Sequence, residues 1–384
     1  MPMRNFHSSA ARILYVTELD PSRKFGSLEQ SIVSLAVRSR NRGGVLVPVF
    51  CGPVPPSLSH RLAIADAPFV ASLDLERWSW SAAKRLLALV DEYAVDIVDF
   101  SFYGPLNHYV TLLSEMRRRL RLVYTDHRSR LPKAERSSGW RRLWKKIALL
   151  QYNKIFAISD FTRAELGKEG WPRLARCQLF VDAVRFRLDP AVRSRVRAEL
   201  GAGDVFVALV VGQLITWKGV DVALRALALA STSAKLWIVG TGTELEALQR
   251  LARDLNLDSR VSFLGEQQDV SPYMQGADCL MCPSLWQEAM GFVNLEAMAS
   301  GLPVIASRTG GIPELVVDEA TGLLVEAGDV TQTAAALRRL IESPDLRKEL
   351  GRKGVAHVGA KYSEEACLEQ YLKNYDTIIG LHAS

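Results

Sequence analysis

The chain has few of the features that hold a protein in a membrane or stabilise it outside the cell. No apolar run among its 384 residues approaches the roughly 20 residues that cross a bilayer. Residues 1–10 carry no apolar signal segment and lead directly into a predicted strand at 12–17. The five cysteines are scattered and odd in number, which is typical of a protein kept reduced. The sequence therefore predicts a cytoplasmic protein.

Several familiar catalytic and metal-binding patterns are also absent. The sequence contains no serine nucleophile elbow, no HExxH helix and no P-loop lysine. The GTGTE run at 240–244 lacks the third glycine of a dinucleotide site. Cys279 and Cys282 form a single CxxC, and their side chains point to opposite faces of a predicted strand. We therefore expect neither a metal ion nor a bound cofactor.

The chain does contain a long alternation of apolar strand patterns with helical patterns. Such an alternation predicts parallel sheets that are covered on both faces by helices. In the first half we predict strands at 12–17, 45–50, 95–100, 121–126 and 154–159, and helices at 27–40, 81–93, 106–119, 140–151 and 160–169.

The charged segment 182–204 has no strand pattern, and a second alternation begins at residue 205. We therefore predict two doubly wound, Rossmann-like α/β domains, 1–187 and 188–361, which the chain is long enough to form. The tail 362–384 contains a further predicted helix at 363–379.

The most informative segment is the run 283–311, PSLWQEAMGFVNLEAMASGLPVIASRTGG. Glu288 and Glu296 lie eight residues apart in it, around a turn at 290–292 that opens a predicted helix at 293–300. Gly301 is predicted to end that helix in the left-handed conformation, before a buried strand at 302–307. The GGIPE run at 310–314 predicts a second helix start after that strand. Two such starts after consecutive strands are typical of the ligand crevice of a doubly wound sheet.

This pattern is suited to a nucleotide sugar. The N–H groups and the partial positive charge of a helix start bind phosphate. Gly291 has no Cβ and lets a ligand approach the backbone closely. The carboxylates of Glu288 and Glu296 flank that position and would accept hydrogen bonds from the hydroxyls of a sugar and a ribose. For either glutamate alone, the alternative is an ordinary capping or solvated role. The residues that we expect to bind the phosphate here are Ala289, Met290, Gly291, Phe292 and Val293.

Over nearly its whole length the chain resembles the retaining GT-B glycosyltransferases of the GT4 type. The resemblance rests on five motifs in this order: GQLITWKG at 212–219, GTGTE at 240–244, VSFLG at 261–265, the run from Glu288 to Glu296, and GGIPE at 310–314. It implies two domains that face a cleft, a nucleotide diphosphate sugar as donor, most often UDP-linked, and retention of the anomeric configuration. It also implies that the C-terminal helix packs back on the first domain.

The resemblance further implies roles for particular residues. Glu288 would bind hydroxyls of the donor sugar, and Glu296 would bind the ribose. Lys218, which follows the strand predicted at 205–211, would hold the diphosphate and neutralise it as it leaves. His127, directly after the strand at 121–126, resembles the family's histidine beside the donor sugar. We therefore predict His127, Lys218 and Glu288 as catalytic residues; the alternatives are a structural histidine and a solvated lysine.

One position in the phosphate site departs from the family's pattern. Gln213 stands where an arginine normally shares the phosphate with the lysine, and its amide donates hydrogen bonds without bringing charge. Arg23, Lys24 or Arg308 would have to compensate. The departure keeps open an alternative function, a catalytically silent partner protein that only binds sugar nucleotides.

The loop after the first strand keeps only one glycine of the family's usual pair. Gly26 and Ser27 are predicted to place backbone N–H groups near the donor phosphate. The alternative is that they only begin a helix, with the serine as its cap.

Positive charge is concentrated in one stretch. Residues 117–146 carry twelve arginines and lysines against two acidic residues, a net charge of +10 in a chain whose total is +6. Within this stretch the segment 139–150, GWRRLWKKIALL, is amphipathic, with Trp140 and Trp144 on one side. Tryptophan and basic residues on one helix are typical of a contact with an anionic membrane surface. The alternative is a helix with inward tryptophans and a solvated basic face.

These charges also guide the choice of acceptor. We predict a lipid-linked or other cell-envelope saccharide, bound by a protein at the inner face of the membrane. A small soluble acceptor, such as an antibiotic aminocyclitol, is the alternative, although the positive field would repel a cationic one. No nucleic-acid recognition motif accompanies the basic stretch, so we expect no nucleic-acid partner.

Overall fold

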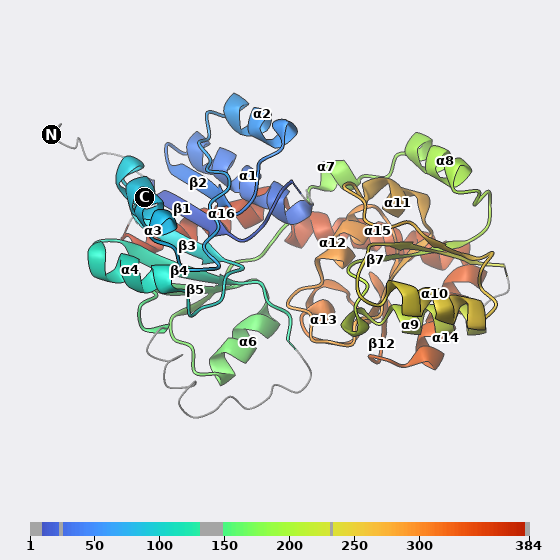
Figure 1. The fold of residues 1–384 in the computed structure, drawn as a ribbon. Coiled ribbons are helices and arrows are strands. Elements are labelled where there is room, and N and C mark those ends of the chain that lie inside the picture. Colours follow the sequence, from blue (N-terminus) through green and yellow to red (C-terminus); the bar gives the residue numbers. More distant parts are fainter. Residues whose placement is uncertain (1–9, 23–25, 131–148, 231–232, 381–384) are drawn as a thin grey trace. The chain divides into compact units, whose positions relative to one another are not determined.

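The computed structural model describes residues 10–22, 26–130, 149–230 and 233–380. They form two compact units (Figure 1). Unit 1 contains the described residues up to Arg128, then 149–179 and 364–380; unit 2 contains residues 129–130 and the described residues of 180–363. Each unit is built on one six-stranded parallel sheet with helices on its faces, which confirms the predicted pair of doubly wound α/β sheets.

The sheet of unit 1 has the strand order β2-β1-β3-β4-β5-β6. Every neighbouring pair is parallel, so all six strands end at the same edge. The order reverses between β1 and β3, and in such sheets ligands bind beyond the carboxyl ends of the strands at that reversal. The strands are β1 (Arg12–Thr17), β2 (Val45–Phe50), β3 (Ile97–Ser101), β4 (Arg121–Asp126), β5 (Lys154–Ala157) and β6 (Leu174–Arg176).

The helices of unit 1 follow the predicted pattern with two differences. The helix predicted at 106–119 is shorter, and α2 was not predicted, because its prolines at the start read as a turn. The helix predicted at 140–151 lies outside the described residues except for its last three. The helices are α1 (Ser27–Asn41), α2 (Pro56–Ile64), α3 (Trp80–Glu92), α4 (His108–Met116), α6 (Asp160–Lys168) and α16 (Glu364–Ile378).

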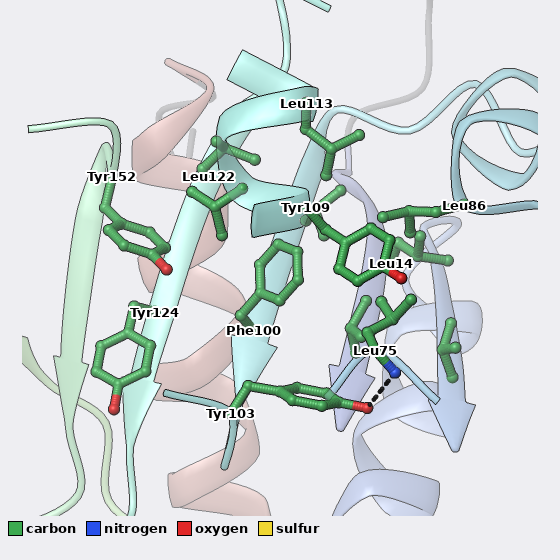
Figure 2. Close-up of a cluster of buried hydrophobic side chains, with 14 of the residues drawn as sticks. Leu14, Leu75, Leu86, Phe100, Tyr103, Tyr109, Leu113, Leu122, Tyr124 and Tyr152 are labelled. Carbon is green, nitrogen blue, oxygen red and sulfur yellow. Dashed lines mark hydrogen bonds between the residues drawn. The ribbon is translucent and has the colours of Figure 1, made fainter. Parts of the chain in front are cut away.

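One face of this sheet is covered by α3 and α4. Ser79 caps the start of α3, because its side chain accepts the Ala82 N–H, and the helix turns Leu86 and Leu89 toward the strands. Figure 2 shows Phe100, Tyr103 and Tyr109 in this core, all of them buried. The Leu75 amide donates to the Tyr103 hydroxyl at 3.2 Å, so this tyrosine is buried without losing its hydrogen bond.

The other side of the same sheet receives α16 at a buried carboxyl group. Asp99 on β3 is fully buried, and its oxygens accept hydrogen bonds from Thr125 at 2.9 Å and from Tyr375 of α16 at 2.5 Å. Phe156 packs against Tyr375 and Tyr371 of the same helix. A C-terminal helix is therefore joined to the first sheet by both aromatic packing and a hydrogen bond to a buried acid.

The sheet of unit 2 has the strand order β12-β11-β10-β7-β8-β9, again with all described neighbours parallel. The chain moves outward from β7 to β9 and then crosses back to β10, so the order reverses between β7 and β10. The strands are β7 (Val207–Val211), β8 (Lys235–Val239), β9 (Val261–Phe263), β10 (Cys279–Cys282), β11 (Val304–Ser307) and β12 (Gly322–Val325).

The helices of unit 2 alternate with these strands, and two of them, α7 and α8, occupy the charged segment before β7. None of the helices in the described part of the chain is long and apolar enough to cross a bilayer. The helices are α7 (Ala183–Phe186), α8 (Pro190–Glu199), the 3-10 turn η1 (Thr216–Lys218), α9 (Val220–Ala230), α10 (Leu245–Asp254), α11 (Ser271–Gly276), α12 (Phe292–Ala299), α13 (Ile312–Leu315), α14 (Val330–Glu342) and α15 (Pro344–Lys361).

The buried Asp99 carboxyl predicts a pH-dependent stability of unit 1. Burial raises its pKa from 3.8 to about 7, although the hydrogen bonds from Tyr375 and Thr125 oppose the shift. Between those two values the folded state binds this proton more tightly than the unfolded chain, so the free energy of unfolding should fall as pH rises and level off above about pH 7. Scanning calorimetry between pH 4 and 8 should show a flatter dependence in Asp99→Asn.

The matched control is Asp66→Asn, which replaces a largely exposed aspartate of the same unit. It should leave the pH dependence unchanged. The burial argument would be contradicted by an Asp99→Asn protein whose stability varies with pH as steeply as that of the wild type.

Candidate functional site

Two loops that leave the reversal point of the unit 2 sheet pack backbone to backbone. One follows β7 and leads through η1 to Gly219, and the other follows β10 through Pro283. Gly219 has φ +63°, and a Cβ there would lie 2.1 Å from the Pro283 carbonyl oxygen. The Leu285 amide donates to the Trp217 carbonyl at 2.8 Å. Only glycine fits at this contact, so the glycine at position 219 is what allows the two loops to pack this closely.

This contact brings Lys218 and Glu288 into an ion pair. The Lys218 Nζ lies 2.6 Å from Glu288 Oε1 and 5.2 Å from the centre of the Trp286 ring. Ser284 donates to the same carboxylate oxygen at 2.8 Å, and Ser129 donates to Oε2 at 3.1 Å. The Glu288 side chain is only 8% exposed, so this charge is held by its partners rather than by water.

The partners of Glu288 decide its protonation state. Burial by itself raises the pKa of a carboxyl group, but the charge of Lys218 and the hydrogen bonds from Lys218 and Ser284 outweigh it and lower the pKa of Glu288 below its usual value. Glu288 is therefore an anion at neutral pH, and it serves as a hydrogen-bond acceptor and not as an acid.

The backbone around Glu288 is fixed from two sides. Gln287 and Arg130 exchange backbone hydrogen bonds at 2.8 Å in each direction. The Gly311 amide donates to the Glu288 carbonyl at 2.8 Å, and a Cβ on Gly310 would lie 2.2 Å from that same carbonyl oxygen. The GGIPE run therefore supports the Glu288 backbone, in addition to opening α13.

The helix start that follows Glu288 is formed as predicted. Gly291 is the N-cap of α12 with φ +77°, and Ser300 and Gly301 end the helix, Gly301 with φ +73°. Asn294 donates to the Gly291 carbonyl through its backbone at 2.9 Å and its side chain at 3.0 Å. Glu296 lies one turn into α12 and is half-buried. Glu288 therefore lies in the connection between β10 and α12, and Glu296 lies in α12 itself.

In unit 1, His127 lies where the sequence predicted it, directly after β4. Its Nε2 is 2.9 Å from Ser101 Oγ at the end of β3, and its ring stacks on Phe102 with centroids 4.0 Å apart. Burial lowers the pKa of His127 to about 4, although the charge of Asp126 opposes the shift. The imidazole is therefore neutral at pH 7.

Gly26 and Ser27 stand at the start of α1, with Gly26 and not the serine as N-cap. The Gly26 amide donates to Glu29 Oε2 at 2.7 Å, and Glu29 is buried. A buried carboxylate at this helix start competes with a phosphate for the same N–H groups. A role of Gly26 and Ser27 in donor binding stays a prediction.

The structure also describes Gln213, which stands at the position of the family's arginine. Gln213 is exposed in the loop after β7. Arg308, one of the candidates to replace the missing charge, pairs with Asp318 at 2.5 Å and with Glu326 at 3.5 Å. The other two candidates, Arg23 and Lys24, lie outside the described residues.

The structure adds residues that the motifs did not indicate. Ser284 and Ser129 both donate to Glu288, and Trp286 lies under the Lys218 ammonium group. Each of the serines follows the end of a parallel strand within three residues, which is the signal that could have identified them. Within the described ranges, no group of three or more His, Cys, Asp or Glu side chains is arranged to hold a metal ion.

Two family models match the chain, one in each half. The family "Glycosyl transferases group 1" matches residues 192–357, and "Glycosyltransferase Family 4" matches residues 28–183. Each match covers one of the two predicted domains.

Two curated relatives extend the match. The chain is 32% identical over 295 residues to the GDP-mannose-dependent alpha-(1-6)-phosphatidylinositol monomannoside mannosyltransferase of Mycolicibacterium smegmatis, covering 71% of this chain and 74% of that protein. It is 33% identical over 223 residues to the lipopolysaccharide core biosynthesis glycosyltransferase LpsD of Rhizobium meliloti, covering 58% of this chain and 63% of that one.

Solved structures match over almost the whole chain. Anabaena HepE in complex with UDP-glucose superposes with a TM-score of 0.79 at 20% identity, covering 96% of this chain and all of that one (100%). Sucrose-phosphate synthase from Thermosynechococcus elongatus superposes with a TM-score of 0.80 at 20% identity, covering 97% and 100%. At this identity the likeness concerns the fold, and it confirms the two-sheet GT-B fold.

Proposed function

The chain belongs to the group 1 glycosyltransferases, and we propose that it transfers a sugar from a nucleoside diphosphate sugar to an acceptor hydroxyl with retention of the anomeric configuration. The observation that carries this proposal is the Lys218–Glu288 pair beside the start of α12. A cation, a carboxylate and free helix N–H groups are the three kinds of group that a diphosphate sugar needs.

The pair keeps capacity for a ligand. The Lys218 ammonium group has three N–H donors, of which Glu288 takes one, so it can also bind a phosphate oxygen. The carboxylate of Glu288 has lone pairs left on Oε2 beside the one that Ser129 uses, and they can accept sugar hydroxyls. Glu296, one turn further into α12, is our proposed ligand of the ribose.

The chemistry follows from these positions. When the bond between the anomeric carbon and the phosphate oxygen breaks, negative charge develops on the diphosphate, and Lys218 with the start of α12 would stabilise it. The acceptor hydroxyl attacks the same face, and its proton passes to an oxygen of the leaving phosphate. No side chain forms a covalent bond to the sugar, and no metal ion is needed to neutralise the diphosphate.

Two donor nucleotides, UDP and GDP, are each supported by one observation. The resemblance of the motifs favours a UDP-sugar, whereas the name of the Mycolicibacterium smegmatis relative specifies GDP-mannose. Both donors present the same diphosphate to Lys218, so they differ in the base and the sugar and not in the reacting centre.

For the acceptor we propose a lipid-linked or cell-envelope saccharide. The names of the two curated relatives refer to a phosphatidylinositol mannoside and to a lipopolysaccharide core. The stretch 117–146 adds strong positive charge, although 131–148 lies outside the described residues. On the described surface of unit 1, Trp80 is 71% exposed beside Trp78, which suits an interface with lipid headgroups.

A small soluble acceptor is the second candidate, and one observation favours it. Burial raises the pKa of Glu18, which follows β1, and the nearby charges of Glu76 and Asp74 raise it further. These carboxylates gather at the edge of unit 1 where its strands end, and they would bind hydroxyl or ammonium groups of an acceptor such as an aminocyclitol.

The first test offers the pure protein a panel of UDP- and GDP-sugars in the presence of EDTA, with hydrolysis and binding as readouts. One donor should be hydrolysed without added metal. Lys218→Ala should lower hydrolysis by roughly a hundredfold, since the leaving charge loses its main partner. Lys353→Ala, at a helix surface pair with Glu349, is the matched control and should behave as the wild type.

Two outcomes of this test would contradict the proposal, one for the phosphate site and one for catalysis. Undiminished hydrolysis by Lys218→Ala would place the diphosphate elsewhere. Tight binding of a donor with no hydrolysis or transfer would favour the catalytically silent partner protein, for which the uncharged Gln213 is the reason. In that case Gln213→Arg should tighten the binding of UDP or GDP.

A second prediction separates the two glutamates. If Glu296 binds the ribose, Glu296→Ala should weaken the binding of free UDP or GDP by about 1.5–3 kcal/mol, as expected for a hydrogen bond to a charged group. Glu288→Gln should leave the free nucleotide nearly unaffected and weaken the intact sugar nucleotide. Calorimetric titration measures both, and equal losses for nucleotide and sugar nucleotide in both variants would refute the assignment.

A third prediction concerns the membrane. The protein should co-sediment with vesicles rich in anionic lipid at low salt, and less so at physiological ionic strength, where the screening length is about 8 Å. Replacing Arg141, Arg142, Lys145 and Lys146 by glutamate should abolish sedimentation and spare donor hydrolysis. The matched control replaces four exposed basic residues of unit 2, namely Arg250, Arg253, Lys348 and Arg352. Failure of the wild type to sediment at low salt would favour the soluble acceptor.

A further inference from the structure

Unit 2 contains a cavity of about 750 Å³ at the edge of its sheet where the strands begin. Phe206, Ser233 and Asp278 line it, and they lie one or two residues before β7, β8 and β10. The other walls come from α8 and the loop after it, the last turn of α14 and the first turn of α15. Lys218 and Glu288 follow the opposite ends of β7 and β10, so the cavity is separate from the candidate donor site. Its volume is in the range of small-molecule sites, roughly 300–1,000 Å³.

Two of the three arginines that line the cavity are paired with a buried acid. Arg193 Nη2 donates to Asp278 Oδ1 at 2.6 Å, and Arg197 Nη1 donates to Oδ2 at 3.1 Å. The Asp278 side chain is 13% exposed, and its Oδ2 also accepts the Val207 amide at 2.8 Å. Two guanidinium groups therefore share one carboxylate, which leaves one positive charge in excess at this edge of the sheet.

The third arginine, Arg347, has no acidic partner among the residues that the structure describes. Its Nη1 donates to the carbonyl oxygens of Leu340 and Ile341 at the end of α14, and its guanidinium carbon lies 5.3 Å from the centre of the Phe206 ring. These contacts stabilise the end of α14, and they occupy Nη1 and one face of the group. Within the same described residues, Nε and Nη2 have no hydrogen-bond partner.

This edge of Arg347 has the geometry that phosphate recognition uses. Nε–H and Nη2–H point the same way and can donate two parallel hydrogen bonds to two oxygens of one anion. Arg193 Nε and the Ser194 hydroxyl line the same cavity as further donors. Across the lining, three arginines stand against two acids, Asp204 and Asp278, so the net charge is +1. Arg347 is half-buried, and an anionic ligand would replace the hydration that its charge has lost.

We propose that this cavity binds a small phosphorylated molecule, whose phosphate accepts two hydrogen bonds from the Nε–Nη2 edge of Arg347. Arg193 and Ser194 would bind the remaining phosphate oxygen, and the rest of the volume would hold the organic part of the molecule. Phosphate is favoured over carboxylate because it offers three acceptor oxygens and up to two negative charges. The inference goes beyond the proposed transferase function and does not depend on it, since none of these residues belongs to the donor site.

NMR of arginine side chains tests this site directly. In protein labelled with ¹⁵N in arginine, the probes are inorganic phosphate and glucose 6-phosphate, and the Nε–H signal of Arg347 is identified by its absence in Arg347→Met. This signal should shift and saturate with at least one probe. The signal of Arg352, an exposed arginine of the same helix, is the control and should stay in place. Tighter binding of glucose 6-phosphate would favour a phosphorylated sugar as the ligand, and equal affinities would favour phosphate itself.

A charge placed on the cavity wall tests the affinity and leaves every guanidinium group intact. Ala198 is exposed on α8 and lines the cavity. Ala198→Glu should weaken the binding of the probe roughly fivefold, because the new negative charge repels the phosphate. Ala198→Gln has nearly the same size without the charge, so it is the matched control and should bind as the wild type.

Three results would overturn the proposal. An Arg347 signal that does not move at millimolar concentrations of either probe would show that its free edge is only hydrated. Equal shifts of the Arg347 and Arg352 signals would indicate a general effect of ionic strength. Unchanged affinity in Ala198→Glu would place the phosphate elsewhere.

The same measurements separate this site from the donor site. Lys218→Ala should leave the titration of Arg347 unchanged, and a changed titration would overturn the separation of the two sites. Arg347→Met should hydrolyse the sugar nucleotide as the wild type does. Should the wild type hydrolyse no donor, the transferase proposal is contradicted, while the titration still decides whether the cavity binds phosphate. If Arg347→Met does not fold, Arg347→Lys, which keeps the charge, serves to identify the signal.

Discussion

The ion pair between Lys218 and Glu288 is the interaction on which the candidate site depends. It joins the loops that follow β7 and β10, the two strands at which the order of the unit 2 sheet reverses. Removing two charges from water costs several kcal/mol, so a buried pair persists only when further hydrogen bonds complete it. Ser284 and Ser129 supply them for the carboxylate, and the glycines at 219 and 310 let the supporting backbones approach. Loss of Lys218 would leave the charge of the buried Glu288 without its cation.

The two units prepare their polar groups in different ways. In unit 2 the groups at the carboxyl end of the sheet are charged, with the pKa of Glu288 held low by its partners. In unit 1 burial opposes charge: it lowers the pKa of His127, directly after β4, to about 4, and it raises the pKa of Asp99, within β3, to about 7. The charged groups of unit 2 suit the diphosphate of the proposed donor.

The reaction class and the acceptor have different kinds of support. Membership of the group 1 glycosyltransferases follows from matches that span both predicted domains and from a relative with 32% identity. The proposals for the acceptor depend instead on charge, and the chain carries clusters of both signs. The basic stretch 117–146 favours an anionic or lipid-linked acceptor, whereas the carboxylates around Glu18 favour a hydroxyl-rich or cationic one.

The sequence by itself determined the fold and the family. The strand at 45–50 was predicted with its observed bounds, because a parallel strand buried on both faces is a continuous apolar run. The strand at 121–126 was also predicted with its observed bounds, from a shorter apolar run. The motifs also placed Lys218, Glu288 and the start of α12, since glycines and charges at strand ends are local signals. The sequence analysis missed β6, because three residues are too few to show a period, and α2, because the prolines at its start indicate a turn.

Only the tertiary structure decided which side chains meet. Tyr375 donates to Asp99 across 276 residues of sequence, Ser129 to Glu288 across 159, and Tyr15 to Ser101 across 86. No local pattern marks a serine or a tyrosine for such a partner. Hydrogen bonds depend on distance and direction in space, and these are set by strand order and register, which bring together residues that lie far apart in the chain.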